Sequence, residues 1–301
     1  MTKWDDMRVF LAVARSESLS RAAPVLRMDV ATVGRRIARL ERDLGAALFV
    51  KSPQGYALTD LGSRMRNHAA EAESSLTQAI DEAQGAGDQA GLTGQIRIGA
   101  PDGAANFLLP QVCAAISAEN PGLEIQILAL PRVVNLSKRE ADLAITVSPP
   151  QAGRLTVQKI SDYHLHLAAG QNVQIHSLQD LKMHRVIGYI PDMIFDKELD
   201  YLGEIGAHGV QVASNSVAVQ VMAMRAAALG EGRPCVGIMH DFALPFAPEL
   251  KRVLTDALSL TRSFYLVRHV SDRTSDRLNR FTTALNSGLR AEISRLEALV
   301  A

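Results

Sequence analysis

The chain has 301 residues, enough for two or three domains with a sizeable core. Its 32 Lys and Arg residues balance 32 Asp and Glu residues, which argues against a polybasic coat for nucleic acid. The balance hides an asymmetry, because residues 1–58 carry 10 basic and 6 acidic side chains and the remainder carries 22 and 26. A basic head on a mildly acidic body is the distribution that phosphate binding by one domain would produce.

The cysteines and the apolar runs exclude further classes of protein. Cys113 and Cys235 lie far apart, with no CxxC pair and no cluster of cysteine and histidine nearby. We therefore expect two buried thiols, and neither a disulfide framework nor a zinc site. No apolar run reaches the roughly 20 residues of a membrane span, and the first ten residues, MTKWDDMRVF, lack the apolar stretch of a signal peptide. We expect a cytoplasmic protein without a membrane partner.

Three helices are predicted in the head. The first covers residues 5–16, with an apolar stripe at helical spacing, and the second covers residues 20–26 after Ser18 or Ser20 as its cap. Asp29 caps a third helix that runs to about residue 43, where Gly45 supplies a stop signal.

The third helix separates an apolar face from a face of arginines and short side chains. The predicted core face consists of Val30, Val33, Ile37, Leu40 and Leu44. The opposite face consists of Ala31, Thr32, Arg35, Arg39 and Arg42. Charged stripes are often only solvated helix faces. A helix of this kind that follows a tight turn can instead enter the major groove, where arginine pairs with guanine edges or with phosphates.

A hairpin after the third helix favours the DNA-binding interpretation. The apolar runs 48–50 and 56–58 flank residues 51–55, which begin with a lysine and contain Pro53 and Gly55 at the tip. A helix-turn-helix followed by a basic wing is a much narrower pattern than either part.

The head resembles that of the LysR family of transcriptional regulators. The matching segments are WDDMRVFLAVA at 4–14, SLSRAA at 18–23, RRIARLE at 35–41, LG at 44–45, LF at 48–49 and LTDLG at 58–62. The resemblance implies a winged helix-turn-helix domain over residues 1–58 and a dimer that reads a pseudo-palindromic operator in double-stranded DNA. The residues expected on DNA are Ser20, Arg21, Val30, Ala31, Thr32, Arg35, Arg36, Arg39, Lys51 and Ser52.

Two positions in the third helix depart from the family pattern. The family usually begins this helix with Ser-Gln-Pro/Ser-Ala-Val-Ser, whereas this chain has DVATVG at 29–34. Val30 replaces a frequent base-contacting glutamine and Gly34 replaces a frequent serine. Because Val30 can touch a thymine methyl but cannot form a hydrogen bond with a base, the operator cannot be inferred from relatives. DNA binding itself rests on the arginines and the wing.

Residues 59–94 are predicted to form a linker, with one long helix and a glycine-rich hinge at 85–91. Apolar residues recur along the helix at steps of three and four, close to a heptad seam. Such a seam needs a partner, which is either its own chain or, as the resemblance favours, a second subunit in a homodimer or homotetramer. The seam consists of Leu61, Met65, Ala69, Ala72, Leu76, Ile80 and Ala83.

Residues 95–301 alternate short strands and helices, which predicts an α/β fold with a parallel, doubly wound sheet. Lobe I is expected over about 95–161 and 268–301, and lobe II over about 162–267. The runs 165–169 and 264–267 would cross between the lobes, and a last helix from about 272 to 299 would return to lobe I. Strands are expected at 95–99, 123–129, 142–147, 185–190, 210–214 and 236–239, and helices at 108–118 and 136–140.

This body resembles the effector domain of the same family, which shares the architecture of periplasmic binding proteins. The segments GQIRIGAPDG at 94–103 and READLAI at 139–145 carry the likeness. It implies a small-molecule effector between the lobes, beyond the carboxyl ends of the strands. The chemistry of that effector stays open. The residues expected to line its site are Ala100, Pro101, Asp102, Gly103, Ala104, Val147, Ser148, Asn215 and Ser216.

Several of these residues have a second interpretation. Free N–H groups at the start of a helix could hold a carboxylate, and Asp102 is acidic where such an anion would dock, although it could simply cap its own helix. Asn215 and Ser216 equally suit an ordinary helix cap. Ala100 and Pro101 stand where family members that bind aromatic acids often carry serine or threonine.

No catalytic motif of the P-loop, GxSxG or HExxH type occurs in the sequence. His164 and His166 alternate along a predicted strand and share a face, a spacing that could suggest metal ligands, but a packed or solvated pair is favoured because no third ligand is near. We expect a regulator with no enzymatic activity, no metal and no cofactor. The alternative, suggested by the body alone, is a solute-binding protein or another non-catalytic two-lobed protein that binds a ligand.

Overall fold

The computed structural model describes residues 3–52, 55–83, 91–129, 141–151, 153–194, 196–199, 210–230 and 234–300. The chain divides into two compact units, Met1–Ala90 and Gly91–Ala301. None of the described helices combines the length and the hydropathy needed to cross a membrane.

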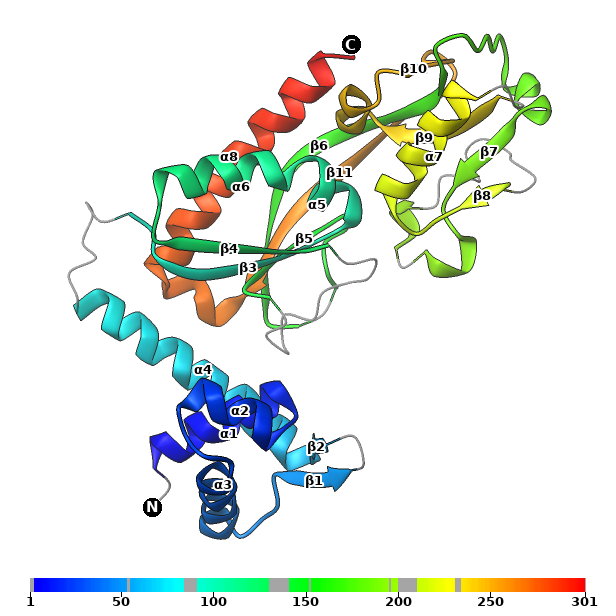
Figure 1. The fold of residues 1–301 in the computed structure, drawn as a ribbon. Helices are drawn as coiled ribbons and strands as arrows, with labels where there is room; N and C mark the ends of the chain where they lie inside the picture. Colours follow the sequence, from blue (N-terminus) through cyan, green and yellow to red (C-terminus); the bar gives the residue numbers. More distant parts are fainter. Residues whose placement is uncertain are drawn as a thin grey trace. The chain divides into compact units, whose positions relative to one another are not determined.

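The first unit is a three-helix head with a two-stranded wing, followed by a long helix (Figure 1). The wing strands are antiparallel, and Phe49 lies opposite Leu58. The elements are α1 (Trp4–Ser16), α2 (Leu19–Leu26), α3 (Val30–Leu44), β1 (Phe49–Ser52), β2 (Gly55–Leu58) and α4 (Asp60–Ala83).

Local signals set the helix ends of the head. Ser18 caps α2, since its side chain accepts a hydrogen bond from the N–H of Arg21. Asp29 caps α3 through the N–H of Thr32 at 2.8 Å, and Gly45 ends α3 with a φ of 65°. The predicted cap at Asp29 and the predicted stop at Gly45 are confirmed.

The apolar face of α3 is narrower than the sequence predicted. Val33, Ile37 and Leu40 are buried in the head core, together with Phe10 of α1. Val30 is 43% exposed, because it lies in the first turn and at the edge of the apolar face. Placing Val30 in the core was therefore wrong.

The first turns of α4 pack against the head, and the helix then extends beyond the head core. Leu61, Met65 and Ala69 pack on the head core, whereas Leu76 is 45% exposed and Ile80 is 53% exposed. The seam therefore has two parts. Its first half has a partner in its own chain, and in its second half Ala72 is half-buried while Leu76 and Ile80 are exposed.

The second unit contains one mixed sheet with helices packed on it. Its strands are β3 (Gly94–Ala100), β4 (Leu123–Ala129), β5 (Leu143–Thr146), β6 (Leu155–Gly170), β7 (Arg185–Gly188), β8 (Val212–Ala213), β9 (Cys235–His240), β10 (Leu250–Arg252) and β11 (Ser259–His269). Its α-helices are α5 (Asp102–Phe107), α6 (Leu109–Glu119), α7 (Val217–Leu229) and α8 (Asp276–Ala298). Its 3-10 helices are η2 (Leu178–Met183), η3 (Pro191–Met193), η4 (Lys197–Leu199), η6 (Asp241–Phe246) and η7 (Val270–Thr274).

The strand order is β4-β3-β5-β11-β6-β9-β7-β8, and β10 pairs with β6. Pairing is parallel among β4, β3 and β5 and again among β9, β7 and β8. The long strands β6 and β11 pair antiparallel with each other and join the two parallel groups. Figure 1 shows these groups as two lobes that β6 and β11 connect. The predicted parallel sheet thus holds within each lobe and not across the whole sheet.

Several predicted elements differ in extent. The helix expected at 108–118 corresponds to α6, and a separate short helix, α5, precedes it and ends at Leu108. The strand expected at 210–214 is reduced to β8. The two predicted crossing runs are parts of the much longer β6 and β11. The helix expected at 136–140 lies outside the described residues.

The core of the second unit surrounds the central strands. Ile96, Leu143 and Phe281 are fully buried there. Helices α6 and α8 approach so closely at Gly288 that a Cβ on this residue would lie 2.6 Å from Val112 Cγ1. The expected burial of the two cysteines is confirmed, since Cys113 and Cys235 are 7% and 5% exposed.

Candidate functional site

The exposed start of α3 carries a chain of polar contacts. The backbone N–H and the hydroxyl of Thr32 donate to the Asp29 carboxylate at 2.8 and 2.7 Å, and Arg35 Nη2 donates to Thr32 Oγ1 at 2.8 Å. These hydrogen bonds from Thr32 hold the pKa of Asp29 below its usual value. Arg35 is therefore oriented along an exposed face that also presents Val30 and Ala31.

Two of the candidate arginines are used inside the head. Asp6 of α1 is 1% exposed. Its carboxylate accepts hydrogen bonds from Arg39 Nε at 2.8 Å and from Arg39 Nη2, and it forms an ion pair with Arg36 Nη1 at 3.6 Å. The hydrogen bond to Asp6 raises the pKa of Arg39 further. Since a buried carboxylate is costly without a charged partner, these arginines fasten α3 to α1. The Arg39 side chain keeps 41% of its surface exposed.

The wing is held against the head by hydrogen bonds that its backbone N–H groups donate. Glu41 Oε1 accepts the N–H groups of Leu48 and Phe49 at 2.8 and 3.1 Å. The N–H of Tyr56 donates to Glu17 O at 2.9 Å, and a Cβ on Gly55 would lie 2.5 Å from the same oxygen. Only glycine fits at this close approach, where φ is +133°.

The remaining candidates of the head lie at its surface or beyond what is described. Ser20 and Arg21 are exposed in the first turn of α2. Lys51 and Ser52 belong to β1, opposite Tyr56 and Gly55. The side chains of Lys51 and Ser52 lie outside the described residues, as does the predicted wing tip at 53–54.

In the second unit, several residues expected to line the cleft belong to the core. Ala100, Ala104 and Val147 are at most 5% exposed and pack in the main cluster. Gly103 is buried against α7, since a Cβ on it would lie 3.4 Å from Val217 Cγ2. Pro101 precedes α5 and makes no side-chain cap contact.

Asp102 caps the helix of the opposite lobe. Its Oδ2 accepts the hydroxyl of Ser216 at 3.0 Å and the N–H of Ala218 at 3.1 Å, both at the start of α7. Its Oδ1 accepts Asn106 Nδ2 at 2.9 Å. The alternative that Asp102 merely caps its own helix is wrong in this respect, because its backbone-donor partner belongs to α7.

The other polar candidates have contacts of their own. Ser148 Oγ donates to Asp196 Oδ2 in a second contact between the lobes. Ser216 is the N-cap of α7, and its Oγ accepts the N–H of Val219 at 3.3 Å, which confirms the interpretation as a helix cap. Asn215 is half-buried directly before it.

Sequence reasoning missed two residues at this junction, Asp196 and Tyr189. Tyr189 is 7% exposed and follows β7 directly, so that the rule placing sites after the carboxyl ends of strands could have found it. Burial, with a smaller contribution from the negative charge of Asp102, raises the pKa of the Tyr189 hydroxyl. Asp196 had no such signal, because it lies in an irregular segment.

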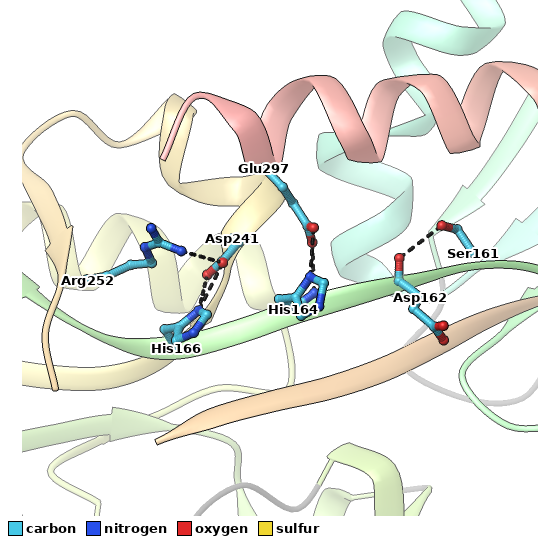
Figure 2. A network of polar contacts seen from close by, with 7 residues as sticks. All are labelled: Ser161, Asp162, His164, His166, Asp241, Arg252 and Glu297. Atoms are coloured by element: carbon cyan, nitrogen blue, oxygen red, sulfur yellow. Dashed lines mark hydrogen bonds and ion pairs between the residues drawn. The ribbon is translucent and has the colours of Figure 1, made fainter. Parts of the chain in front are cut away.

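Figure 2 shows that the two histidines of β6 pair with different carboxylates. The N–H and Nδ1 of His164 lie 2.7 and 2.8 Å from the carboxylate oxygens of Glu297 on α8. His166 Nδ1 lies 2.9 Å from both oxygens of the buried Asp241, which also accepts Arg252 Nη1 at 3.1 Å. The sequence favoured a packed or solvated pair; in the structure His166 is buried, and the His164 side chain is 45% exposed. Among the described residues, no group of three or more His, Cys, Asp and Glu side chains could hold a metal ion.

Two family models match the chain and together cover most of it. The model described as a bacterial regulatory helix-turn-helix protein of the lysR family matches residues 4–63. The model described as the LysR substrate binding domain matches residues 89–290. The first match contains the head and the start of α4, and the second contains the two-lobed sheet.

Curated relatives are bacterial transcriptional regulators. DgdR of Burkholderia cepacia is 33% identical over 152 residues, which are 50% of this chain and 50% of the relative. IlvY of Escherichia coli is 34% identical over 152 residues, which are 48% of this chain and 49% of the relative. The matched part of the chain thus spans about half the length of these relatives.

Solved structures share the fold at low sequence identity. A full-length OxyR variant from Pseudomonas aeruginosa has a TM-score of 0.71 and 17% identity, over 96% of this chain and 95% of that one. Full-length LysG from Corynebacterium glutamicum, described with a bound arginine effector, has a TM-score of 0.63 and 19% identity, over 96% of this chain and 99% of that one.

Proposed function

Because the chain belongs to the LysR family of bacterial transcriptional regulators, we propose that it binds operator DNA through α3 and the wing and responds to a small molecule between its lobes. The observation that carries the proposal is the exposed start of α3. There, Asp29 and Thr32 orient Arg35 beside the short side chain of Ala31.

We assign direct base contacts to this face. Arg35 has the donors for a guanine edge or a phosphate, and Val30 supplies an apolar group that suits a thymine methyl. We assign contacts with the phosphate backbone to Ser20 and Arg21 at the start of α2 and to Lys51 and Ser52 of the wing. The main role of Arg36 and Arg39 is to hold α3 against α1 through their contacts with Asp6.

The proposed effector site comprises the polar groups where the lobes meet, Asp102, Ser148, Asn215 and Ser216. Their neighbours Ala100, Pro101, Gly103, Ala104 and Val147 form its packed base. Solved structures with this fold are described with bound molecules as different as an arginine effector and hydrogen peroxide. Family membership therefore does not identify the effector of this chain.

We further propose a homodimer or homotetramer, formed through the exposed half of the α4 seam, that acts in the cytoplasm without enzymatic activity. The curated relatives are regulators, which supports this assignment over a solute-binding protein. Two heads on one duplex raise the effective concentration of the second head.

The DNA-binding assignment is tested by Arg35→Ala in the full chain. We expect about a tenfold or greater loss of affinity for the promoter region upstream of its own gene, since a base contact by arginine contributes about 1–3 kcal/mol. The measurement is a gel shift at moderate salt. Arg42→Ala is the matched control, because Arg42 is exposed in the last turn of the same helix.

The control separates a specific contact from general charge. We expect a loss of less than about threefold for Arg42→Ala, as for one exposed charge. Unchanged affinity for Arg35→Ala, in a variant that unfolds at the wild-type temperature, would remove Arg35 from the DNA-binding surface.

A further inference from the structure

The two lobes are joined by carboxylates that reach across in opposite directions. Asp102 of lobe I accepts hydrogen bonds from Ser216 and Ala218 of lobe II. Asp196 of lobe II accepts one from Ser148 of lobe I. Each lobe therefore supplies one carboxylate acceptor and at least one donor to the other.

The position of Asp102 is one that suits a bound anion. The first N–H groups of a helix have no partner within it, and the helix dipole makes that end positive. Helix α7 is 13 residues long, and the Asp102 carboxylate takes up the N–H of Ala218 together with the Ser216 hydroxyl. The chain itself thus provides the negative group.

The neighbouring residues hold the Asp102 carboxylate in place. Both oxygens of Asp102 have donors, because Oδ1 accepts Asn106 Nδ2. Directly beside it, Gly103 lies against Val217 of α7. Burial, with a smaller contribution from the charge of Asp102, raises the pKa of the nearby Tyr189. A carboxylate ligand at this end of the junction would compete with Asp102 for the same two donors.

We propose that Asp102 is a specificity-determining residue that occupies the start of α7 as a built-in carboxylate and excludes small carboxylates from it. The inference rests on the proposed sensing role of the junction between the lobes. Effectors of this chain then engage groups other than the start of α7, or displace Asp102 from it.

Removing the side chain should convert this position into a site for an added carboxylate. Asp102→Ala frees the Ser216 hydroxyl and the Ala218 N–H while leaving the backbone of α5 in place. Acetate is the probe, since it matches the removed group. We expect Asp102→Ala to lower the unfolding temperature of the full chain and acetate to restore it in part.

The experiment compares potassium acetate with potassium chloride at equal ionic strength and pH 7, with unfolding followed by circular dichroism. We expect acetate to bind Asp102→Ala about tenfold more tightly than the wild type. Asp192→Ala is the matched control, because Asp192 is exposed in η3 of the same lobe as α7, and it should show no gain from acetate. The double variant Asp102→Ala with Ser216→Ala should lose most of the gain.

Three outcomes would overturn the inference. They are equal stabilisation of the wild type by acetate, no stabilisation of Asp102→Ala, and equal stabilisation of that variant by chloride. If Asp102→Ala does not fold by itself, expression of this variant with potassium acetate or with potassium chloride supplies the same comparison by recovery of soluble protein. The Arg35→Ala gel shift fails or succeeds independently of these results, so the two proposals are distinguished.

Discussion

At the scale of single residues, burial decides the charge state of His240. This side chain ends β9, is 4% exposed, and lies beside Tyr163 and Phe242 with ring centroids 5.5 and 5.0 Å away. Burial lowers the pKa of His240 from 6.5 to about 3. The folded chain therefore keeps this imidazole neutral.

The pH dependence of stability follows from this shift. Between pH 6.5 and about 3 the unfolded chain binds a proton at His240 and the folded chain does not. The free energy of unfolding then falls by about 1.4 kcal/mol for each unit that the pH drops through this range. We expect His240→Phe to reduce the slope between pH 6.5 and 4.5 by about one proton, measured by urea unfolding at several pH values.

Met183→Phe is the control for that slope, because Met183 is 77% exposed and carries no titratable group. This variant should keep the wild-type dependence. An unchanged slope in His240→Phe would show that His240 is protonated in the folded chain.

Residue types were predictable from the sequence, and their partners were not. The sequence placed Arg36 and Arg39 on a DNA-facing surface. In the structure both pair with the carboxylate of Asp6, which belongs to a different helix. It also marked Asp102 as an anion at a helix start, yet the helix concerned is α7, more than a hundred residues along the chain.

At the scale of elements, the start of α4 depends on a glycine. A Cβ on Gly62 would lie 2.1 Å from Leu48 O, an oxygen that also accepts the N–H of Thr59 at 3.0 Å. Thr59 Oγ1 in turn accepts the N–H of Gly62 at 2.9 Å. The first turn of α4 can pass this close to the Leu48 backbone only because residue 62 has no side chain.

Gly62→Ala is therefore expected to destabilise the head by about 1–3 kcal/mol, as overpacking does, although alanine is the better helix former. Trp4 is the only tryptophan of the chain and lies in α1, so that its fluorescence during urea unfolding reports on the head.

Gly34→Ala provides the opposite expectation. The nearest atom to a Cβ on Gly34 is Leu19 Cδ1 at 3.6 Å, an ordinary contact, so helix propensity should stabilise the head by about 0.5–1 kcal/mol. A loss of stability in Gly34→Ala, or none in Gly62→Ala, would contradict this account of the two glycines.

Element boundaries were predictable where a local signal marks them. The caps at Asp29 and Gly45 and the strand β4 agree with the sequence. Strands β6 and β11 are much longer than the predicted runs 165–169 and 264–267. Their length is set by their pairing with each other over eleven residue pairs, and not by their apolar pattern. A strand such as β8 is short because only two of its residues pair with β7.

At the scale of the whole molecule, the exposed half of the α4 seam predicts self-association. Leu76 and Ile80 are about half exposed on a helix whose earlier seam residues are packed on the head. We expect the wild type to sediment as a dimer or tetramer, and the double variant Leu76→Glu with Ile80→Glu to dissociate at least about tenfold more readily, since two buried apolar contacts would be lost.

Analytical ultracentrifugation over a range of concentrations checks this prediction. Arg64→Glu is the control, because Arg64 is exposed on the same helix outside the seam. A wild-type monomer at every concentration would exclude the helix pair, and equal effects of the two changes would point to general charge repulsion.

The sequence by itself determined the helices of the head, their caps, the alternating strands of the body and the resemblance to the LysR family. Each of these depends on signals within one element, such as a cap, a helical period or an ordered set of motifs. Only the tertiary structure decided that Arg36 and Arg39 bind Asp6, that Asp102 caps α7, and that the α4 seam is half covered. These outcomes depend on which distant segments meet in the fold. A buried charge, or the unpaired N–H groups at the start of a helix, must pair with a group that the fold brings within hydrogen-bonding distance.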